Sequence, residues 1–271
     1  MLYAGVGLKL ANSFARKHLI IPAGICATFV VCLTPIAIYG AQQWLGLWPD
    51  DNTVFRQFHH RIKWLWLYME LGTLVTGLVV AWRYKYPFLI MPIAVTLWYI
   101  SMDAVMLIID HEDLWNSYTW QFRALVSMYF GALMTLLAFW VDIRARNTAD
   151  YAFWLYLFGV LAFWGGLTSQ DSDSELSKFI YFCINLAMIG AGALLVRRVF
   201  VIFGALGCCL YLGHLASTVF EDSWLFPVAL SAIGLGVVYS GIWWQKNEAR
   251  ITKSAQAILP KALQELLANK A

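Results

Sequence analysis

Long, nearly charge-free apolar blocks alternate along this chain with short polar connections. A helix rises about 1.5 Å per residue, so about 20 apolar residues are needed to cross a hydrocarbon layer roughly 30 Å thick. The blocks here reach that length. They are also apolar on every face, whereas the strands of a membrane β-barrel alternate apolar and polar residues. The pattern therefore predicts an all-α protein, a polytopic bundle of transmembrane helices.

Eight blocks reach the spanning length, which predicts about eight transmembrane helices. The least distinct boundary lies between the sixth and seventh blocks, where only Arg197 and Arg198 interrupt an apolar run about twice as long as one crossing needs. A tight turn is expected at these two arginines. The predicted helices cover residues 19–48, 64–82, 88–110, 124–141, 151–168, 179–196, 199–219 and 225–244.

The eight blocks divide the chain into three parts. Residues 1–18 form a basic N-terminal segment, residues 19–244 form the transmembrane bundle, and residues 245–271 form a tail whose apolar residues recur at helical spacing. The tail is expected to be an amphipathic helix lying on the membrane surface. The first block is longer than the apolar core of a cleavable signal peptide, which favours a helix that remains in the protein.

The overall composition agrees with a membrane environment. Hydrophobic residues make up 61% of the chain and charged residues 13%, about half the charged fraction of a typical soluble domain. The lipid bilayer is therefore the expected surrounding. The net charge is +3 and the lysines and arginines are dispersed, so no nucleic-acid-binding surface is predicted.

The distribution of positive charge predicts the orientation. Cytoplasmic loops of membrane proteins retain more Lys and Arg than the loops on the other side. With eight spans, 14 of the 19 Lys and Arg residues fall on the side that carries the chain ends, and both termini are therefore expected in the cytoplasm. The five that fall on the other side are Arg56, Arg61, Lys63, Arg123 and Lys178.

Two carboxyl groups lie inside predicted spans, where a charge is costly. Near mid-membrane that cost is about 2.5 to 3.5 kcal/mol, so such an acid is a candidate functional residue. Glu70 lies six residues inside the second helix, a depth of about 9 Å, and Asp103 lies seven residues before Asp110, a depth of about 10 Å. Both acids are expected at the same level, closer to the outer surface.

Two further polar residues are expected near this level, Asn185 in the sixth helix and His214 in the seventh. Carboxylates and an imidazole at one depth can relay protons or bind a cation. Glu70, Asp103, Asn185 and His214 are therefore predicted to form an ion or proton site that opens outward. The alternative is structural, with the two acids hydrogen-bonded to neighbouring helices through Asn185, His214, Ser101 or Thr73.

The remaining chemistry is weaker. His59, His60 and His111 are candidate metal ligands on the outer side, although contacts with lipid headgroups would explain the first pair and an acidic helix end the third. No cofactor is expected. The chain contains no phosphate-binding loop, nucleophile elbow or zinc-protease motif, and an enzyme is therefore not predicted.

Two function classes follow. The first is a small permease or ion- and proton-conducting protein. The second is a non-catalytic scaffold or partner subunit, since glycines recur in the later helices and small residues allow close helix packing within a protomer, a homo-oligomer or a membrane complex. The expected location is a cell membrane, the inner membrane of a bacterium. The segments Trp98–Asp103 and Gly204–Trp244 resemble bacterial polytopic membrane proteins, a resemblance that assigns no activity and no functional residue.

Overall fold

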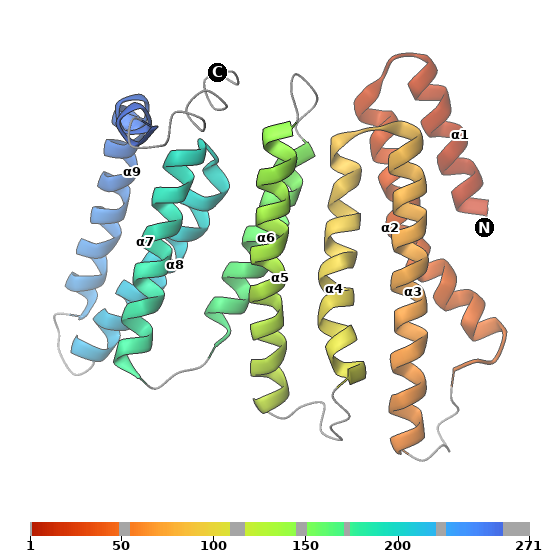
Figure 1. Cartoon of the computed structure of the whole chain (residues 1–271), viewed down its shortest axis with the longest axis horizontal. Coiled ribbons are helices and arrows are strands. Elements are labelled where there is room, and N and C mark those ends of the chain that lie inside the picture. The colour runs from red at the N-terminus through yellow and green to blue at the C-terminus, as the bar shows by residue number, and fades with distance from the viewer. Residues whose placement is uncertain are drawn as a thin grey trace. The chain divides into compact units, whose positions relative to one another are not determined.

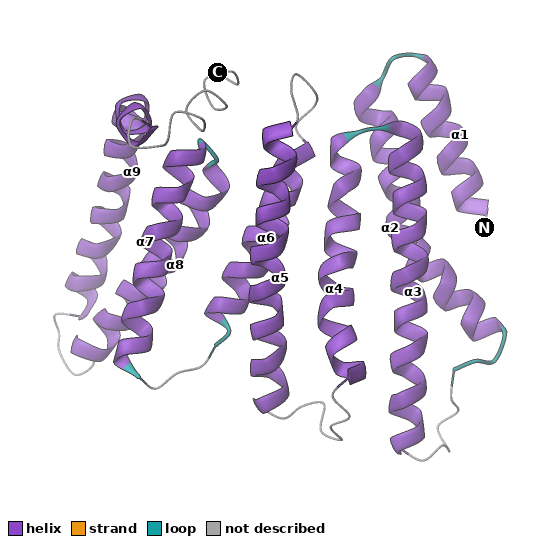
Figure 2. Ribbon diagram, viewed as in Figure 1, coloured by secondary structure: helices purple, strands orange, loops and turns teal. Residues whose placement is uncertain are grey.

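The computed structural model describes residues 2–48, 55–108, 117–144, 151–170, 174–220 and 226–256, and all regular secondary structure within these ranges is helical (Figure 2). The helices are labelled in Figure 1. They are α1 (Leu2–Arg16), α2 (Ile20–Trp44), α3 (Phe55–Tyr84), the short 3₁₀ helix η1 (Pro87–Leu89), α4 (Ile90–Ile108), α5 (Ser117–Arg144), α6 (Tyr151–Thr168), α7 (Glu175–Leu195), α8 (Arg198–Phe220) and α9 (Phe226–Gln256).

Six of these helices are long and apolar enough to cross a membrane. They comprise α2, α6 and α7 in full, and the segments Trp64–Tyr84 of α3, Trp120–Arg144 of α5 and Arg198–Ser217 of α8. The segment Pro87–Asp103 forms a shorter apolar helix. Each of the eight predicted blocks overlaps one helix from α2 to α9, but the count of eight crossings stays a prediction. Six such helices fit an integral membrane protein.

The outward-facing side chains of these helices are apolar, the reverse of a water-soluble bundle. Leu133 and Leu136 on α5 are 66% and 64% exposed, and Ile202 on α8 is 62% exposed. Soluble proteins rarely expose large contiguous apolar surfaces, because water hydrates them unfavourably. Lipid tails impose no such penalty, so the exposed apolar side chains and the length of the helices both fit a membrane protein.

The chain forms two compact units, residues 1–166 and residues 167–271. In unit 1, α2 packs on α3, α3 on α4 and α4 on α5. Hydrogen bonds between helices add to this packing: Gln42 Nε2 donates a buried bond to the Leu65 carbonyl oxygen over 3.1 Å, and Trp98 Nε1 donates a partly buried bond to Ser127 Oγ over 2.8 Å. Ser127 Oγ in turn donates to the Ala162 carbonyl oxygen over 2.9 Å, which links α5 to α6.

The N-terminal segment, predicted only as a basic stretch, is the helix α1. It folds back beside α2 (Figure 1). The close approach depends on small residues, since a Cβ atom at Gly7 would meet the Val30 side chain, and Ala11 and Ala27 are fully buried. Tyr84 Oη donates a hydrogen bond of 3.0 Å to Asn12 Oδ1 and so joins α1 to the end of α3.

The C-terminal boundary also differs from the prediction. The last span was expected to end at residue 244, yet α9 continues without a break to Gln256. The first part of the predicted surface tail, from residue 245, therefore extends this helix. Residues 257–271, which include most of the predicted amphipathic tail, lie outside the described ranges.

The tight turn predicted at Arg197 and Arg198 is confirmed, because α7 ends at Leu195 and α8 begins at Arg198. Val196 makes this turn in the left-handed conformation, with φ of 55° and ψ of 37°. The Arg197 amide then donates to the Gly192 carbonyl oxygen over 3.0 Å. Glycine usually occupies such a position, because a side chain, and a β-branched one most of all, is strained there.

Replacement of this valine by glycine should stabilise the protein. We expect Val196→Gly to raise the free energy of unfolding by about 1 kcal/mol, since left-handed backbone costs a residue with a side chain roughly that much. Unfolding in detergent, followed by tryptophan fluorescence, measures the change. The matched variant Leu195→Gly lies in right-handed helix and should lower stability by about the same amount; a destabilised Val196→Gly variant would show that the turn is unstrained.

Candidate functional site

The two carboxyl groups predicted inside the membrane lie together in unit 1. Glu70 belongs to α3 and Asp103 to α4, and the two carboxyl groups lie close enough to interact through their charges. An ionised carboxylate can only accept hydrogen bonds, so a bond between two carboxyl groups requires a proton on one of them. The packing of α3 against α4 therefore creates a pair of acids suited to sharing a proton.

A third charged residue completes the cluster. Arg123 of α5 donates a hydrogen bond from Nη2 to Asp103 Oδ1 over 3.0 Å, and the two side chains are 32% and 29% exposed. A guanidinium remains protonated at any pH the protein meets. We refer to Glu70, Asp103 and Arg123 as the carboxyl–arginine triad.

The charges of the triad balance only when it holds a proton or another cation. With both acids ionised, the two negative charges exceed the single positive charge of Arg123 by one. One proton on the carboxyl pair makes the triad neutral, which is the state that an apolar surrounding favours. Glu70 Oε2 is buried and has no hydrogen-bond partner among the described residues, so this oxygen can accept a proton or contact a small cation.

Arg123 was missed because it lies just before the predicted fourth span and was counted with the outer loops. In the structure it lies seven residues into α5, inside the apolar segment Trp120–Arg144. A usable signal was present in the sequence. Two antiparallel helices joined by one loop bring together residues at equal distances from that loop, and Asp103 and Arg123 satisfy this condition for the α4–α5 connection.

The alternative partners predicted for the acids in unit 1 bond within their own helices instead. Thr73 Oγ1 donates to the Met69 carbonyl oxygen over 2.7 Å, and Ser101 Oγ donates to the Trp98 carbonyl oxygen over 2.6 Å. Serine and threonine often bond to the preceding helical turn in this way. The hydrogen bonds that cross between helices at the acids therefore come from the triad itself.

Asn185 lies in unit 2 and is completely buried between α7 and α8. Its Nδ2 donates to the Tyr181 carbonyl oxygen over 2.8 Å, while Oδ1 has no hydrogen-bond partner among the described residues. The amide fits only because α8 carries glycine opposite it: a Cβ atom at Gly207 would collide with the Asn185 side chain, and one at Gly204 with the Asn185 backbone oxygen. Asn185 is therefore a packing residue of this helix pair.

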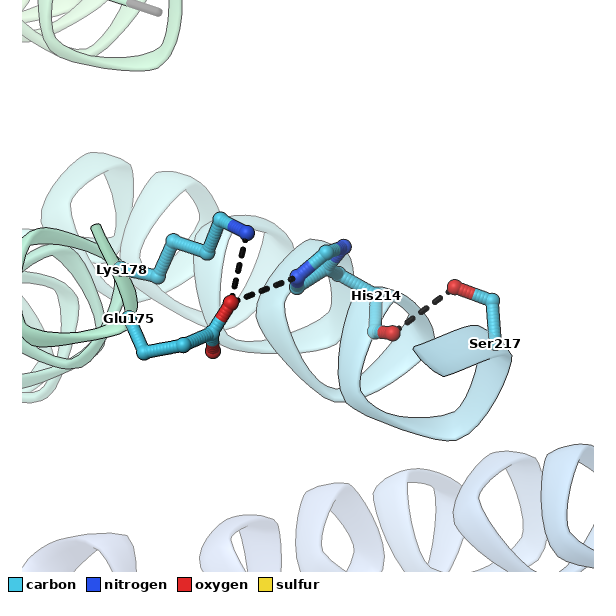
Figure 3. Close-up of polar contacts among 4 residues, drawn as sticks. All are labelled: Glu175, Lys178, His214 and Ser217. Atoms are coloured by element: carbon cyan, nitrogen blue, oxygen red, sulfur yellow. Dashed lines mark hydrogen bonds and ion pairs between the residues drawn. The ribbon is translucent and has the colours of Figure 1, made fainter. Parts of the chain in front are cut away.

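His214 lies nearer the end of α8 and contacts Glu175, the first residue of α7 (Figure 3). Its Nε2 is 3.9 Å from Glu175 Oε1, and the same carboxylate oxygen accepts a hydrogen bond of 2.7 Å from Lys178 Nζ. Glu175 is 68% exposed, and an ion pair on so open a surface contributes little to stability.

The four predicted residues thus divide into distinct contacts. Glu70 and Asp103 meet in unit 1. In unit 2, His214 follows Gly207 by seven residues, about 10 Å along α8, and it contacts Glu175 instead of Asn185. Since the two pairs belong to separate units, a single site formed by all four residues stays a prediction.

The side chains of the three candidate metal ligands, His59, His60 and His111, lie outside the part of the chain that the structure describes. His111 lies outside the described residues, and the side chains of His59 and His60 do too, although their backbone belongs to α3. Within the described part of the chain, no three His, Cys, Asp or Glu residues gather as metal ligands would.

Comparison with protein-family models, curated proteins and solved structures finds no match to this chain. Function is therefore inferred from the chain's own residues and their contacts.

The packing around Asn185 gives a testable prediction. Gly204→Ala should destabilise the protein by about 1 to 3 kcal/mol, because the new methyl group meets the backbone of α7, whereas Gly207→Ala should cost less, because the amide side chain of Asn185 can move. Addition of Asn185→Ala should reverse most of the Gly207→Ala effect. The control is Gly213→Ala, where no heavy atom of a neighbouring element lies within 4 Å of the new Cβ. Unfolding in detergent measures the stability of the three single variants and of the double variant. Equal losses of stability in all of them would refute the assigned contacts.

Proposed function

We propose that this protein is a small permease or ion-conducting protein of a cell membrane, in which the carboxyl–arginine triad exchanges a proton or a small cation. The observation that carries the proposal is the proximity of Glu70 and Asp103, two acids on different apolar helices, beside Arg123, which donates a hydrogen bond to Asp103. A bundle that needed only cohesion could use uncharged side chains, which avoid the desolvation of three charges.

The proposed topology has eight transmembrane helices, α2 to α9, with both termini in the cytoplasm. The excess of Lys and Arg on the side of the chain ends supports this orientation. It locates the triad in the half of the membrane nearer the outer surface, because Glu70 lies six residues after Trp64, where the apolar part of α3 begins. The inner membrane of a bacterium is the proposed location.

The two acids have different roles in the proposed exchange. Arg123 holds the Asp103 carboxylate through a charge-assisted hydrogen bond. Glu70 then carries the exchangeable proton, donated to Asp103 when the site is loaded. Loss of this proton leaves one uncompensated negative charge, which attracts the next proton or a monovalent cation.

Neutral replacements test this assignment. In proteoliposomes with an internal pH-sensitive dye and an imposed proton or sodium gradient, we expect Glu70→Gln and Asp103→Asn to lower flux by roughly tenfold or more, equivalent to about 1.4 kcal/mol in the transport barrier. Both substitutions keep the shape and hydrogen-bonding capacity of the side chain and remove the titratable group.

The control for this experiment is Glu175→Gln, which neutralises an exposed carboxylate of unit 2 and should leave flux unchanged. Undiminished flux in both Glu70→Gln and Asp103→Asn, with normal folding, would reduce the triad to a packing contact. Wild-type protein that carries neither protons nor sodium would leave no basis for an ion-conducting role.

The scaffold alternative depends on glycines that are free to pack against another protein. Several are already used within the chain: Gly131 and Gly159 bring the backbones of α5 and α6 together, and Gly192 and Gly204 do the same for α7 and α8. Others would place an added Cβ atom more than 4 Å from the heavy atoms of neighbouring elements. Three of these lie close together on α9, which makes this helix a candidate contact face: Gly234, Gly236 and Gly241. Stoichiometric co-purification with another membrane protein, lost on Gly234→Leu, together with absence of flux, would favour the scaffold.

A further inference from the structure

The helix α1 stands beside a stretch of α2 that also carries exposed apolar side chains. Gly7 packs on Val30, and Ala11 is buried, which aligns α1 with the first part of α2 (Figure 1). On that same part of α2, Ile21, Ile25 and Phe29 are 70%, 60% and 55% exposed. Because these side chains belong to the membrane-spanning segment Ile20–Trp44, α1 lies within or against one leaflet of the bilayer.

The outward face of α1 carries positive charge. Lys9 and Arg16 are seven residues apart, two helical turns, and so share one face. That face is turned away from α2, since Lys9 lies about 200° around the helix from the buried Gly7, and both cationic side chains are exposed. Lys17 follows in the turn to α2 and is exposed as well.

No carboxylate of the chain balances these three cations in the part that the structure describes. The first 49 residues contain no Asp or Glu at all. The carboxylates of Asp103 and Glu175 pair with Arg123, Lys178 and His214, all of them outside α1. A cation at the edge of an apolar layer requires a counter-charge, and at that depth the phosphate groups of lipids provide one.

We infer that the outward face of α1 binds the headgroup phosphates of anionic phospholipids through Lys9, Arg16 and Lys17. Lys9 lies about 10 Å along α1 from Arg16, and its flexible apolar stem lets the ammonium group extend from the apolar layer to the headgroups. Asn12, bonded to Tyr84, fixes α1 against the end of α3 and so keeps the cations at a constant depth. This lipid-binding role is independent of the triad and of any transport activity.

A matched pair of double variants tests the inference. Lys9→Gln/Arg16→Gln removes two charges from α1, and Lys246→Gln/Arg250→Gln removes two exposed charges from α9. Each full-length protein is purified in neutral detergent and titrated with phosphatidylglycerol, phosphatidylcholine or inorganic phosphate. Native mass spectrometry counts the bound lipid, and the unfolding midpoint reports stabilisation.

We expect phosphatidylglycerol to bind and stabilise the wild-type protein, while phosphatidylcholine and inorganic phosphate have little effect. Each basic residue near an anionic surface contributes about a fivefold factor, so the α1 variant should lose roughly 25-fold in affinity and the α9 variant much less. Equal affinity of wild type and the α1 variant would overturn the inference, as would stabilisation by inorganic phosphate that matches the lipid.

If the Lys9→Gln/Arg16→Gln variant fails to fold, two further measurements still test the inference. Lys9→Arg/Arg16→Lys keeps both charges and should retain lipid binding, and high salt should weaken phosphatidylglycerol binding to the wild-type protein, because ions screen the attraction. Binding that is insensitive to salt would show that apolar contacts hold the lipid and would overturn the proposed role of the cations.

Discussion

The absence of water inside the membrane is the constraint on which the rest of this structure depends. Every polar group in an apolar layer has to find its partner within the protein or in the lipid headgroups. Backbone groups satisfy this requirement through helices, and side chains satisfy it through a small number of bonds between helices. The Glu70–Asp103 contact and the Gln42 bond to Leu65 are both results of this one requirement.

The same constraint explains where small residues occur. Without a hydrophobic drive between helices in lipid, stability comes from close packing and from hydrogen bonds. Ser127 and Gly131 lie one turn apart on α5 and illustrate the two contributions, a hydrogen bond to the Ala162 carbonyl oxygen and a direct approach to the backbone at Phe163. In the other unit, Gly204 and Gly207 let α8 approach the backbone and the side chain of Asn185 closely.

Much of the fold followed from the sequence, because the length of an apolar block reports directly on whether a helix can span a bilayer. The turn at Arg197 was predictable for the same reason. The helix α1 was not predicted, because its 15 residues are too short for a span and because the packing of Gly7 and the burial of Ala11 become visible only when α2 lies beside them. Position along a helix was also informative, since Glu70 and Asp103, which were predicted at one level, lie close together. Direction around a helix was not predictable, so Asn185 was assigned to a polar site although it packs against glycine. Arg123 was missed because it lies just before the predicted fourth span and was counted with the outer loops.

The left-handed residues His18, Lys85 and Val196 have a mechanical consequence. Each lies in the short connection between two consecutive helices, α1 to α2, α3 to α4 and α7 to α8. Few rotatable backbone bonds therefore separate the two helices of each pair. Such short connections leave almost no slack for one member of a pair to slide past the other. A conformational change that moves one helix of such a pair therefore moves the other helix with it. The pair then rotates as a rigid hairpin about the end that carries the connection.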